Sequence, residues 1–452
     1  MDADLHFGQA LLPDGWARDV RVQVTAGRIA AVERGASPQP TDERQGYGLP
    51  GMPNLHSHAF QRGMAGLAER RGNGPDSFWT WRETMYRFVE RMTPADVHAL
   101  AALAYIEMLE GGFTRVGEFH YLHHDIDGGP YVDRAEMAGA IAQAALDSGI
   151  GLTLLPVFYA HSGFGGLPPG DGQRRFVNTI EGFARLLEAS RHAVRGLPDA
   201  VVGIAAHSLR AVTPPELARL AALGGSAPLH IHVAEQLREV DDCLAWSGQR
   251  PVEWLLNHVD LAGNWCLVHA THIIETEVAA LARSGAIAGL CPITEANLGD
   301  GIFPGQMFVS AGGAFGIGSD SNVLIDASEE LRLLEYGQRL ASRSRNVMGD
   351  PGSPSVGAAL YRNACSGGAA ALGAATGIAP GLPADLVSLD PTHPSLTGRG
   401  GDALLDGYAF AAGRHALDCV WRNGVKLVTN GRHRERDRIR ERYRTVLEKL
   451  IA

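Results

Sequence analysis

The sequence predicts an α/β protein built on a (β/α)8 (TIM) barrel, with a small β domain formed by both chain ends. Eight short apolar runs recur over residues 49–319, and helical patterns fill most of the gaps between them. Segments near both ends show the period-two alternation of half-buried strands. No Gly-rich dinucleotide-binding fingerprint follows the first run, which argues against a doubly wound open sheet.

Residues 1–48 are predicted to form short strands and turns. Polar residues alternate with valine over 18–24, which places the valines on one face. Similar runs occur at 384–389 and 419–428, and the second contains an Asn-Gly pair typical of a hairpin turn. Neither end is long enough to bury a sheet alone. We therefore expect 1–48 and 380–430 to form one small β-sandwich-like domain.

The barrel is expected to span residues 49–379. Its strand candidates lie near 49–56, 114–121, 151–158, 201–207, 228–233, 265–269, 286–291 and 314–319. Helical patterns between them include 95–109, 135–148 and 214–223. The Gly/Pro-rich stretch 163–170 is expected to be a loop near the barrel mouth. Residues 431–452 are charged, with apolar residues at helical spacing, and predict a terminal helix.

Composition narrows the class of protein. The chain has 452 residues, 45% hydrophobic and 20% charged, which is ordinary for a globular protein and too apolar for a disordered one. Its net charge of -10 argues against a nucleic-acid binder, and no run of about 18 apolar residues predicts a membrane span. The 5 cysteines form no CxxC pair, so a disulfide framework is not expected. Without a signal-peptide pattern, the expected location is the cytoplasm.

Residues of the types that bind metals follow several predicted barrel strands. They are an HxH pair after the first strand, single histidines ending the fifth and sixth, and an aspartate after the eighth: His56, His58, His232, His269 and Asp320. Residues two apart on an extended chain point the same way, and barrel enzymes place their active sites at these strand ends. Histidines with a carboxylate suit zinc. The sequence therefore predicts a metal site at this end of the barrel.

This pattern resembles the amidohydrolase superfamily, and the resemblance covers nearly the whole chain, including the small β domain. It implies one divalent metal ion, with zinc as the expected ion, held by His56, His58, His232 and Asp320. Iron or manganese would also suit these ligands. Binuclear members commonly bridge two metals with a carbamylated lysine, but this sequence has no lysine before Lys426. A glutamate-bridged pair stays open.

The resemblance also implies a hydrolytic mechanism. His232 and Glu235 match the HxxE motif of the deaminase branch, and this spacing leaves His230 a structural role. A metal ion lowers the pKa of its bound water to about 7. Asp320 would accept that water's proton, and the metal-bound hydroxide would attack an sp2 carbon bearing nitrogen. Glu235 would shuttle protons to the departing nitrogen, while His269 would polarise the substrate.

Three further motifs resemble one branch of the superfamily, whose members hydrolyse N-formimino-L-glutamate to N-formyl-L-glutamate and ammonia in histidine degradation. The motifs are residues 55–63, 77–83 and 207–212. The resemblance implies a small dicarboxylate as the partner, contacted by Gln61, Arg82, Tyr121, His207 and Arg210. Arginine binds carboxylates in a bidentate fork, so Arg82 and Arg210 are the expected clamps. The competing interpretation of each is an ordinary solvated arginine.

Two other functions remain as alternatives. A deaminase of guanine, cytosine or a triazine would use the same metal site, but a neutral ring does not need two arginines. A non-catalytic assembly protein of the superfamily would have lost its ligands, whereas every ligand position and Glu235 are filled here. Dimers are common among such barrels, so a homodimer is expected by analogy alone. His120, His123 and His124 lack the family spacing, and we expect structural or rim positions for them.

Overall fold

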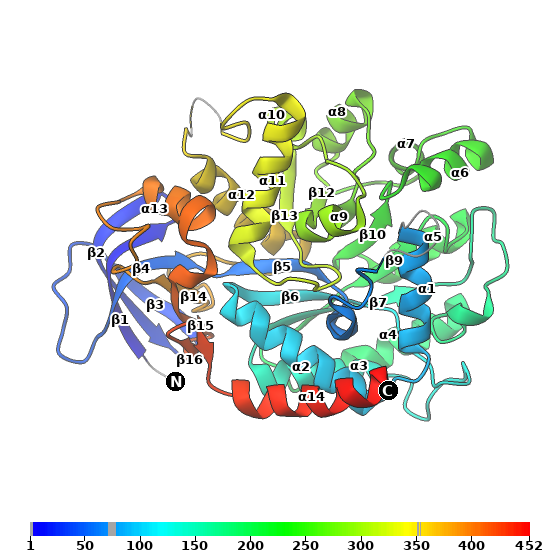
Figure 1. Ribbon diagram of the computed structural model, residues 1–452, viewed down its shortest axis with the longest axis horizontal. Coiled ribbons are helices and arrows are strands. Elements are labelled where there is room, and N and C mark those ends of the chain that lie inside the picture. Colours follow the sequence, from blue (N-terminus) through cyan, green and yellow to red (C-terminus); the bar gives the residue numbers. More distant parts are fainter. Residues whose placement is uncertain (1–2, 71–77, 350–351, 353) are drawn as a thin grey trace.

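Two sheets organise the part of the chain that the computed structural model describes, residues 3–70, 78–349, 352 and 354–452. One is a closed parallel barrel, and the other is a separate sheet at one end of it (Figure 1). The barrel strands are β5 (Met52–Ser57), β6 (Phe113–His120), β7 (Gly151–Phe158), β9 (Ile204–Ser208), β10 (Leu229–Val233), β11 (Trp265–His269), β12 (Ile287–Leu290) and β13 (Ala314–Ile317). The circle closes where β13 pairs with β5, and the short β8 (Val201–Val202) lies beside β7. The predicted barrel is confirmed, and each predicted run overlaps one of its strands.

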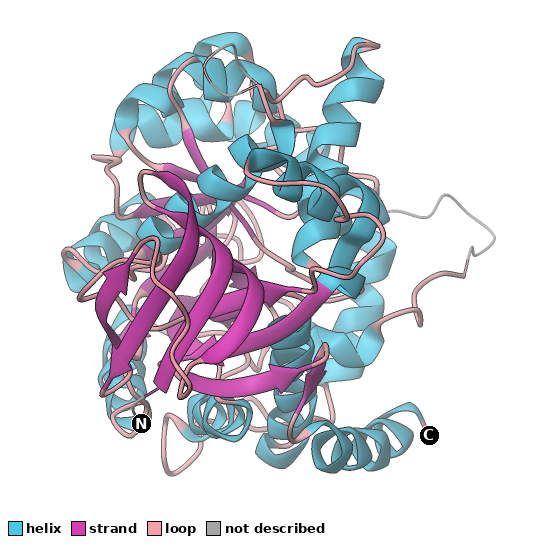
Figure 2. Ribbon diagram, turned by 90° about the vertical axis from the view of Figure 1, so that its left-hand side faces the viewer, coloured by secondary structure: helices cyan, strands magenta, loops and turns pink. Residues whose placement is uncertain are grey.

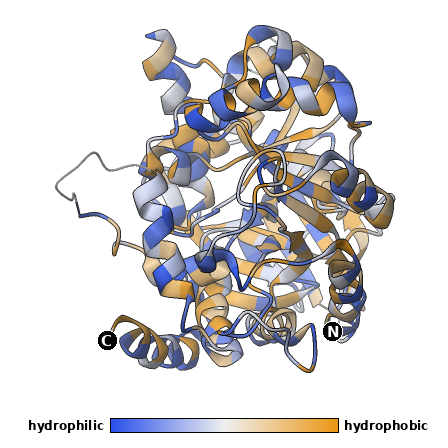
Figure 3. Cartoon of the chain, turned by 90° about the vertical axis from the view of Figure 1, so that its right-hand side faces the viewer, coloured by the Kyte–Doolittle hydropathy of each residue, from blue (hydrophilic) through white to orange (hydrophobic). Residues whose placement is uncertain are grey.

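Helices surround the barrel on its outer side. Those between and after its strands are α2 (Pro94–Glu110), α3 (Glu136–Ser148), α4 (Ile180–Ala193), α5 (Pro214–Gly224), α6 (Leu237–Ser247), α7 (Pro251–His258), α8 (Glu275–Ser284), α9 (Pro292–Leu298), α10 (Gly305–Ser310), α11 (Ala327–Ser342) and α12 (Val356–Ala371). Helices visible in Figure 3 carry both hydrophilic and hydrophobic stretches, as expected of amphipathic helices that cover a sheet. Because helices cover it, a barrel strand such as β6 is buried along its whole length. No helix in the described ranges is long and apolar enough to cross a membrane.

The remaining helices lie at the barrel mouth and in the C-terminal part of the chain. An additional helix, α1 (Phe78–Val89), follows β5 and lies at the end of the barrel away from the separate sheet (Figure 1). The remaining elements are η1 (Ala59–Met64), η2 (Asp171–Gln173), α13 (Asp402–Gly407), η3 (Tyr408–Ala412), η4 (Gly413–Ala416) and α14 (Arg436–Ile451). The terminal helix α14 packs along α2, and Lys449 reaches the N-terminal turn of α2 at Asp96, 2.9 Å away.

The separate sheet combines strands from both chain ends, as the sequence predicts. Its order is β17 (Arg432–His433), β16 (Val425–Thr429), β15 (Leu417–Arg422), β14 (Leu386–Leu389), β4 (Glu43–Pro50), β1 (Ala3–Leu12), β2 (Gly15–Thr25) and β3 (Arg28–Glu33) (Figure 2). The hairpin between β15 and β16 turns at Asn423 and Gly424, whose φ angles of 48° and 71° suit those two residue types. The strands form one continuous hydrogen-bonded sheet, and the sandwich-like description of this domain stays a prediction.

A network of ion pairs built on two buried arginines joins this sheet to the barrel. Arg422 of β15 pairs with Asp199, which precedes β8, at 2.6 Å and with Asp385 at 2.8 Å. Arg115 of β6 pairs with the same Asp199 at 2.5 Å. Only 4% of Arg422 is exposed, so its charge depends on these carboxylates for compensation. The network therefore fixes the sheet against the end of the barrel opposite the predicted site.

Replacing Arg422 with methionine is expected to leave Asp385, itself 5% exposed, without its bonded cation. Breaking a buried ion pair by removing one partner costs about 3–5 kcal/mol. The free energy of unfolding should fall by this amount, seen as a lower denaturation midpoint. The double variant Arg422→Met/Asp385→Leu should recover part of the loss, since it removes both charges. An unchanged midpoint in the single variant would show that the network contributes nothing to stability.

Candidate metal and substrate site

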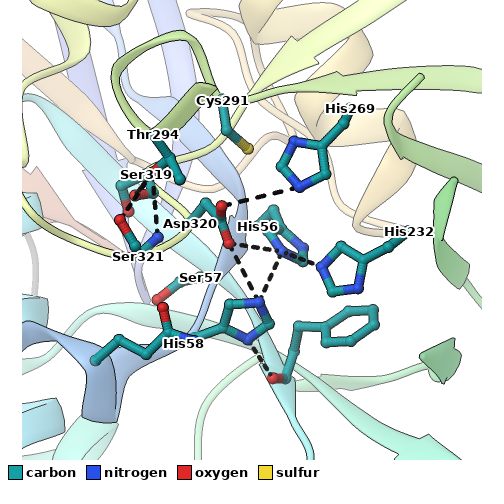
Figure 4. Close-up of polar contacts among 12 residues, drawn as sticks. His56, Ser57, His58, His232, His269, Cys291, Thr294, Ser319, Asp320 and Ser321 are labelled. Atoms are coloured by element: carbon teal, nitrogen blue, oxygen red, sulfur yellow. Dashed lines mark hydrogen bonds and ion pairs between the residues drawn. The ribbon is translucent and has the colours of Figure 1, made fainter. Parts of the chain in front are cut away.

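The predicted ligands converge at the C-terminal end of the barrel (Figure 4). His56 of β5 and His58, just beyond that strand, bring their Nε2 atoms to 3.2 Å from each other. The Nε2 of His232, on β10, lies 3.0 Å from that of His56. Asp320, which follows β13, places Oδ1 3.2 Å from the Nε2 atoms of both His56 and His58. Four ligand atoms from three parts of the chain thus lie within 4.8 Å of one another.

The hydrogen bonds of these histidines indicate that the site is built for a cation. Nδ1 of His58 faces the carbonyl oxygen of Phe119 at 3.0 Å, and Nδ1 of His232 faces that of His207 at 2.9 Å. A carbonyl oxygen only accepts, so both Nδ1 atoms donate and both Nε2 atoms present lone pairs to the centre. Burial lowers the pKa of His56 to about 3, which keeps it neutral. Neutral imidazoles with anchored outer nitrogens, together with a carboxylate, fit a divalent metal ion.

The backbone around the site is held in an uncommon conformation. Non-glycine residues with positive φ gather at the strand ends: Ala234, His269, Ala270, Asp320 and Asn322 have φ angles of 50°, 67°, 48°, 43° and 56°. Such conformations cost about 1–3 kcal/mol each and persist where the surroundings enforce them. Reciprocal hydrogen bonds do so here, since the backbone N–H of Asp320 donates to His56 O and that of His58 donates to Asp320 O, each at 2.9 Å.

Asn322 is a site residue that the sequence analysis missed. Its side-chain amide donates to Ser57 Oγ, His58 O and Asp320 O, each at 3.1 Å. One buried amide thereby joins the loops after β5 and β13, which carry the ligands His58 and Asp320. Its position two residues beyond Asp320 was the available indication, but an asparagine in a loop is too common to be distinguished by sequence.

His269 and Glu235 lie beside the ligand set. Nε2 of His269 is 3.8 Å from Glu235 Oε1 and 3.9 Å from Asp320 Oδ2, while Nδ1 contacts Glu295 Oε1 at 3.2 Å. Burial lowers the pKa of His269, but the carboxylates of Glu235, Glu295 and Asp320 outweigh this effect and raise the pKa to about 10. Burial raises the pKa of Glu235 to about 7. The pair therefore offers a charged donor and a carboxyl group that changes protonation near neutral pH.

A second buried glutamate, Glu239 of α6, holds Glu235 in place. Its two carboxylate oxygens accept the backbone N–H groups of Ala234 and Glu235, each at 3.2 Å. Its charge also lies close to Arg210. Burial lowers the pKa of Arg210, but Glu239, Tyr159 and Glu235 raise it, and the pKa lies above the ordinary value. Glu239 is thus a positioning residue for both the carboxyl group and the arginine.

Replacing Glu239 with glutamine should weaken this support, because an amide can accept only one of the two N–H groups. Loss of a hydrogen bond to a charged group costs about 1.5–3 kcal/mol. We expect kcat/KM to fall about tenfold or more, with a shifted pH profile as Glu235 loses its fixed position. Glu277 is the matched control, since it is equally buried and accepts backbone N–H groups outside the pocket. Equal pH profiles for Glu239→Gln and Glu277→Gln would contradict the positioning role.

The five predicted substrate-binding residues all line one pocket together with His232, Glu235 and Asp320: Gln61, Arg82, Tyr121, His207 and Arg210. Gln61 Nε2 donates to Tyr121 Oη at 2.9 Å. The Nε atoms of Arg82 and Arg210 are buried and have no hydrogen-bond partner among the residues that the structure describes. A buried donor without a partner is costly, and a ligand carboxylate would satisfy these two Nε atoms. Their roles in binding stay predictions; Ser77, which begins the second motif, lies outside the described residues.

The other histidines lie outside the ligand set, as expected. His230 Nε2 bonds to Ala371 O at 2.8 Å, His123 Nε2 to Val157 O at 2.8 Å, and His124 Nε2 to Val177 O at 2.9 Å. His120 is buried on β6. Among the described residues, neither group of neighbouring metal-ligand atoms contains a glutamate, which leaves a glutamate-bridged pair without support.

Comparisons with known proteins agree with this geometry. The family model "Amidohydrolase family" matches residues 47–427, and the model "Formimidoylglutamate deiminase HutF, N-terminal domain" matches residues 4–46. A formimidoylglutamate deiminase of Pseudomonas aeruginosa is 52% identical over 446 residues, 98% of each chain. The crystal structure of an amidohydrolase from Brucella melitensis has a TM-score of 0.96 and 55% identity, covering 100% of both chains. A 5-methylthioadenosine/S-adenosylhomocysteine deaminase of Natronomonas pharaonis is 28% identical over 404 residues, 86% of this chain and 84% of the relative.

Proposed function

Since this chain belongs to the amidohydrolase family, we propose that it hydrolyses N-formimino-L-glutamate and water to N-formyl-L-glutamate and ammonia. The observation that carries this proposal is a pair of buried arginine Nε atoms without hydrogen-bond partners among the described residues. They belong to the pocket that Glu235 and three of the four metal-ligand residues also line. Two cations match the two carboxylates of this substrate. The deiminase of Pseudomonas aeruginosa is similar along almost the whole chain, whereas the ring deaminase of Natronomonas pharaonis is a distant relative.

The residues of the pocket suit this reaction. When bound to His56, His58, His232 and Asp320, a divalent metal ion would supply Lewis acidity. Arg82 and Arg210 bind the carboxylates and so hold the formimino carbon at the barrel end. Glu235 moves protons between water and the departing nitrogen, because its pKa of about 7 lets it both accept and donate. His269 donates from Nε2, with its ring held by Glu295 through Nδ1.

Three finer assignments belong to the same proposal. The metal is zinc, in keeping with three imidazoles and one carboxylate. The reaction belongs to histidine degradation, because its substrate is a formimino derivative of glutamate. The location is the cytoplasm, which is supported by the 5 cysteines: all are free and buried, as is usual in a reducing compartment.

Ammonia release by the metal-loaded protein tests the proposal. N-formimino-L-glutamate, guanine and cytosine are offered at equal concentration, with N-formiminoglycine as a matched substrate that lacks the side-chain carboxylate. We expect rapid release from the first, slow release from N-formiminoglycine and none from the rings. Equal rates on both formimino compounds would contradict the hypothesis that the two arginines bind both carboxylates of the substrate. Activity on a ring alone would overturn the proposed substrate, and metal analysis of the same sample would test the assignment of zinc.

A further inference from the structure

A second cavity adjoins the substrate pocket. It has a volume of about 520 Å³, and Arg82 and Arg210 line both spaces. The two arginines therefore stand between the pocket and this outer cavity. The rest of its wall comes from Trp79 of α1, from the helix α6 and from the loop that follows β7, which includes the glycine-rich stretch at 163–170. Arg210 is 7% exposed and its Nε has no partner among the described residues, so an unsatisfied donor lies at the boundary.

A third arginine stands in the same cavity. The guanidinium carbon of Arg238 lies 4.7 Å from the ring centre of Trp79, while those of Arg82 and Arg210 lie 4.6 and 5.8 Å from the same ring. Arg238 is 65% exposed at its side chain, and its ion pair with Asp242 is 3.7 Å long. Such an exposed pair contributes little. Among the described residues that line the outer cavity, three cations and one carboxylate thus give a net positive charge.

The wall of the outer cavity also suits the carbon chain of a dicarboxylate. Phe164 and Trp246 line it as stacked rings, with centroids 5.4 Å apart and planes inclined by 26°. Apolar rings beside charged groups match a ligand that carries carboxylates on a short methylene chain. The cavity is therefore chemically similar to the pocket it adjoins, and it lacks the metal ligands and Glu235.

The net charge of the whole protein explains why a cluster of cations at the pocket entrance would help a dianion to bind. A chain with net charge -10 repels a dianion at long range. A local group of cations offsets this repulsion and raises the local concentration of anions. A different hollow beside the pocket shares Trp81 and Leu298 with it. Among the described residues, its lining includes Glu69 and neither arginine nor lysine. Of these two approaches, electrostatics favours the one that passes Arg238.

We propose that the outer cavity is a docking subsite for small dicarboxylates on the way into and out of the pocket, with Arg238 as the cation at its entrance. This proposal rests on the proposed function for the identity of the ligand. Arg238 binds one carboxylate first, and Arg210 and Arg82 then receive the substrate at the boundary. No bond of the substrate is made or broken in this cavity. Its effect is on association and on KM, and the chemical step stays unchanged.

Steady-state kinetics at varied ionic strength tests the subsite. Arg238→Gln should lower kcat/KM for N-formimino-L-glutamate about three- to tenfold at low salt with kcat unchanged, and the difference should vanish at high salt. Asp242→Asn should act in the opposite direction, because it removes the one carboxylate among the described residues that line the cavity. Arg219→Gln is the matched control: Arg219 is exposed, pairs with Glu181 at 2.9 Å and changes the net charge equally. Identical kcat/KM for the Arg238 and Arg219 variants at low salt would overturn the subsite.

A second measurement separates this proposal from the proposed function. If the wild-type protein releases no ammonia from N-formimino-L-glutamate, the function fails, and the subsite is tested with glutarate as the probe. Stopped-flow tryptophan fluorescence follows its association, since Trp79 and Trp246 line the cavity. Glutarate should associate more slowly with the Arg238→Gln variant than with the Arg219→Gln variant at low salt. This difference in rate should disappear at high salt. Equal association rates would overturn the subsite whatever the substrate of the enzyme.

Discussion

Replacing Glu235 with glutamine is expected to lower kcat by about 10²–10⁴-fold, the usual contribution of a general acid–base, while the metal stays bound. Glutamine keeps the size and the hydrogen-bonding reach of the side chain but cannot take up and return a proton. Glu235 lies outside the four-residue ligand set, so the ligands are untouched. Ammonia release gives kcat, and metal analysis of the same preparation shows whether the site is loaded.

The pH profile adds a second readout for Glu235. Burial raises the pKa of Glu235 to about 7, so the wild-type rate should change near neutral pH. The Glu235→Gln variant should lose that change along with most of its rate. A variant with kcat within about threefold of wild type would reject the proton-shuttle role. Loss of metal together with loss of rate would instead assign Glu235 to the stability of the site.

Replacing Arg210 with methionine is expected to reduce kcat/KM for N-formimino-L-glutamate by the equivalent of about 2–5 kcal/mol, or about 30-fold to several thousandfold. Arg210 is buried beside the pocket, and its Nε lacks a partner among the described residues. A carboxylate would supply that partner in a desolvated, charge-assisted contact. Methionine fills a similar volume without the charge, so the folded structure should persist.

Arg175 offers the contrast that makes this test specific. It is just as buried, but its guanidinium donates to three backbone carbonyls, of His124, Val89 and Met92, at 3.0, 2.5 and 2.8 Å. Arg175→Met should therefore lower stability and leave kcat/KM of the folded fraction near wild type. If Arg210→Met behaves in the same way, Arg210 is a structural arginine and the clamp must be sought elsewhere. With N-formiminoglycine, which lacks the side-chain carboxylate, Arg210→Met should cause a smaller loss of kcat/KM if Arg210 binds that carboxylate.

The barrel and its ligand set were predictable because both depend on local pattern. Parallel strands buried on both faces leave short apolar runs, and the ligands stand directly at the ends of those runs. The HxxE spacing separated His232 from His230, and the carbonyl of Ala371 now accounts for His230. The arginines were harder, since 38 arginines left Arg82 and Arg210 distinguishable only by resemblance.

Other features depend on contacts between distant parts of the chain, which a single sequence does not reveal. Glu295 reaches His269 from the helix after β12, and Asn322 joins loops that are more than 250 residues apart. Glu239 and Glu277 are both buried glutamates that accept backbone N–H groups, and only the fold shows that one of them faces the pocket. The continuity of the small sheet likewise follows from the pairing of β14 with β4, which sequence alternation does not specify.

That pairing has a consequence for the protein's biosynthesis. The ribosome completes β4 at Pro50 and reaches β14 only at Leu386, after the whole barrel. At about 5–20 residues per second, β4 waits roughly 20–70 s for its neighbour, with its backbone donors and acceptors unpaired along one edge. Edges of this kind pair readily with foreign strands. A nascent or truncated chain that ends before Leu386 therefore exposes the unpaired edge of β4, which β14 covers in the full-length chain. C-terminal truncation is thus expected to promote aggregation even where the barrel itself is complete.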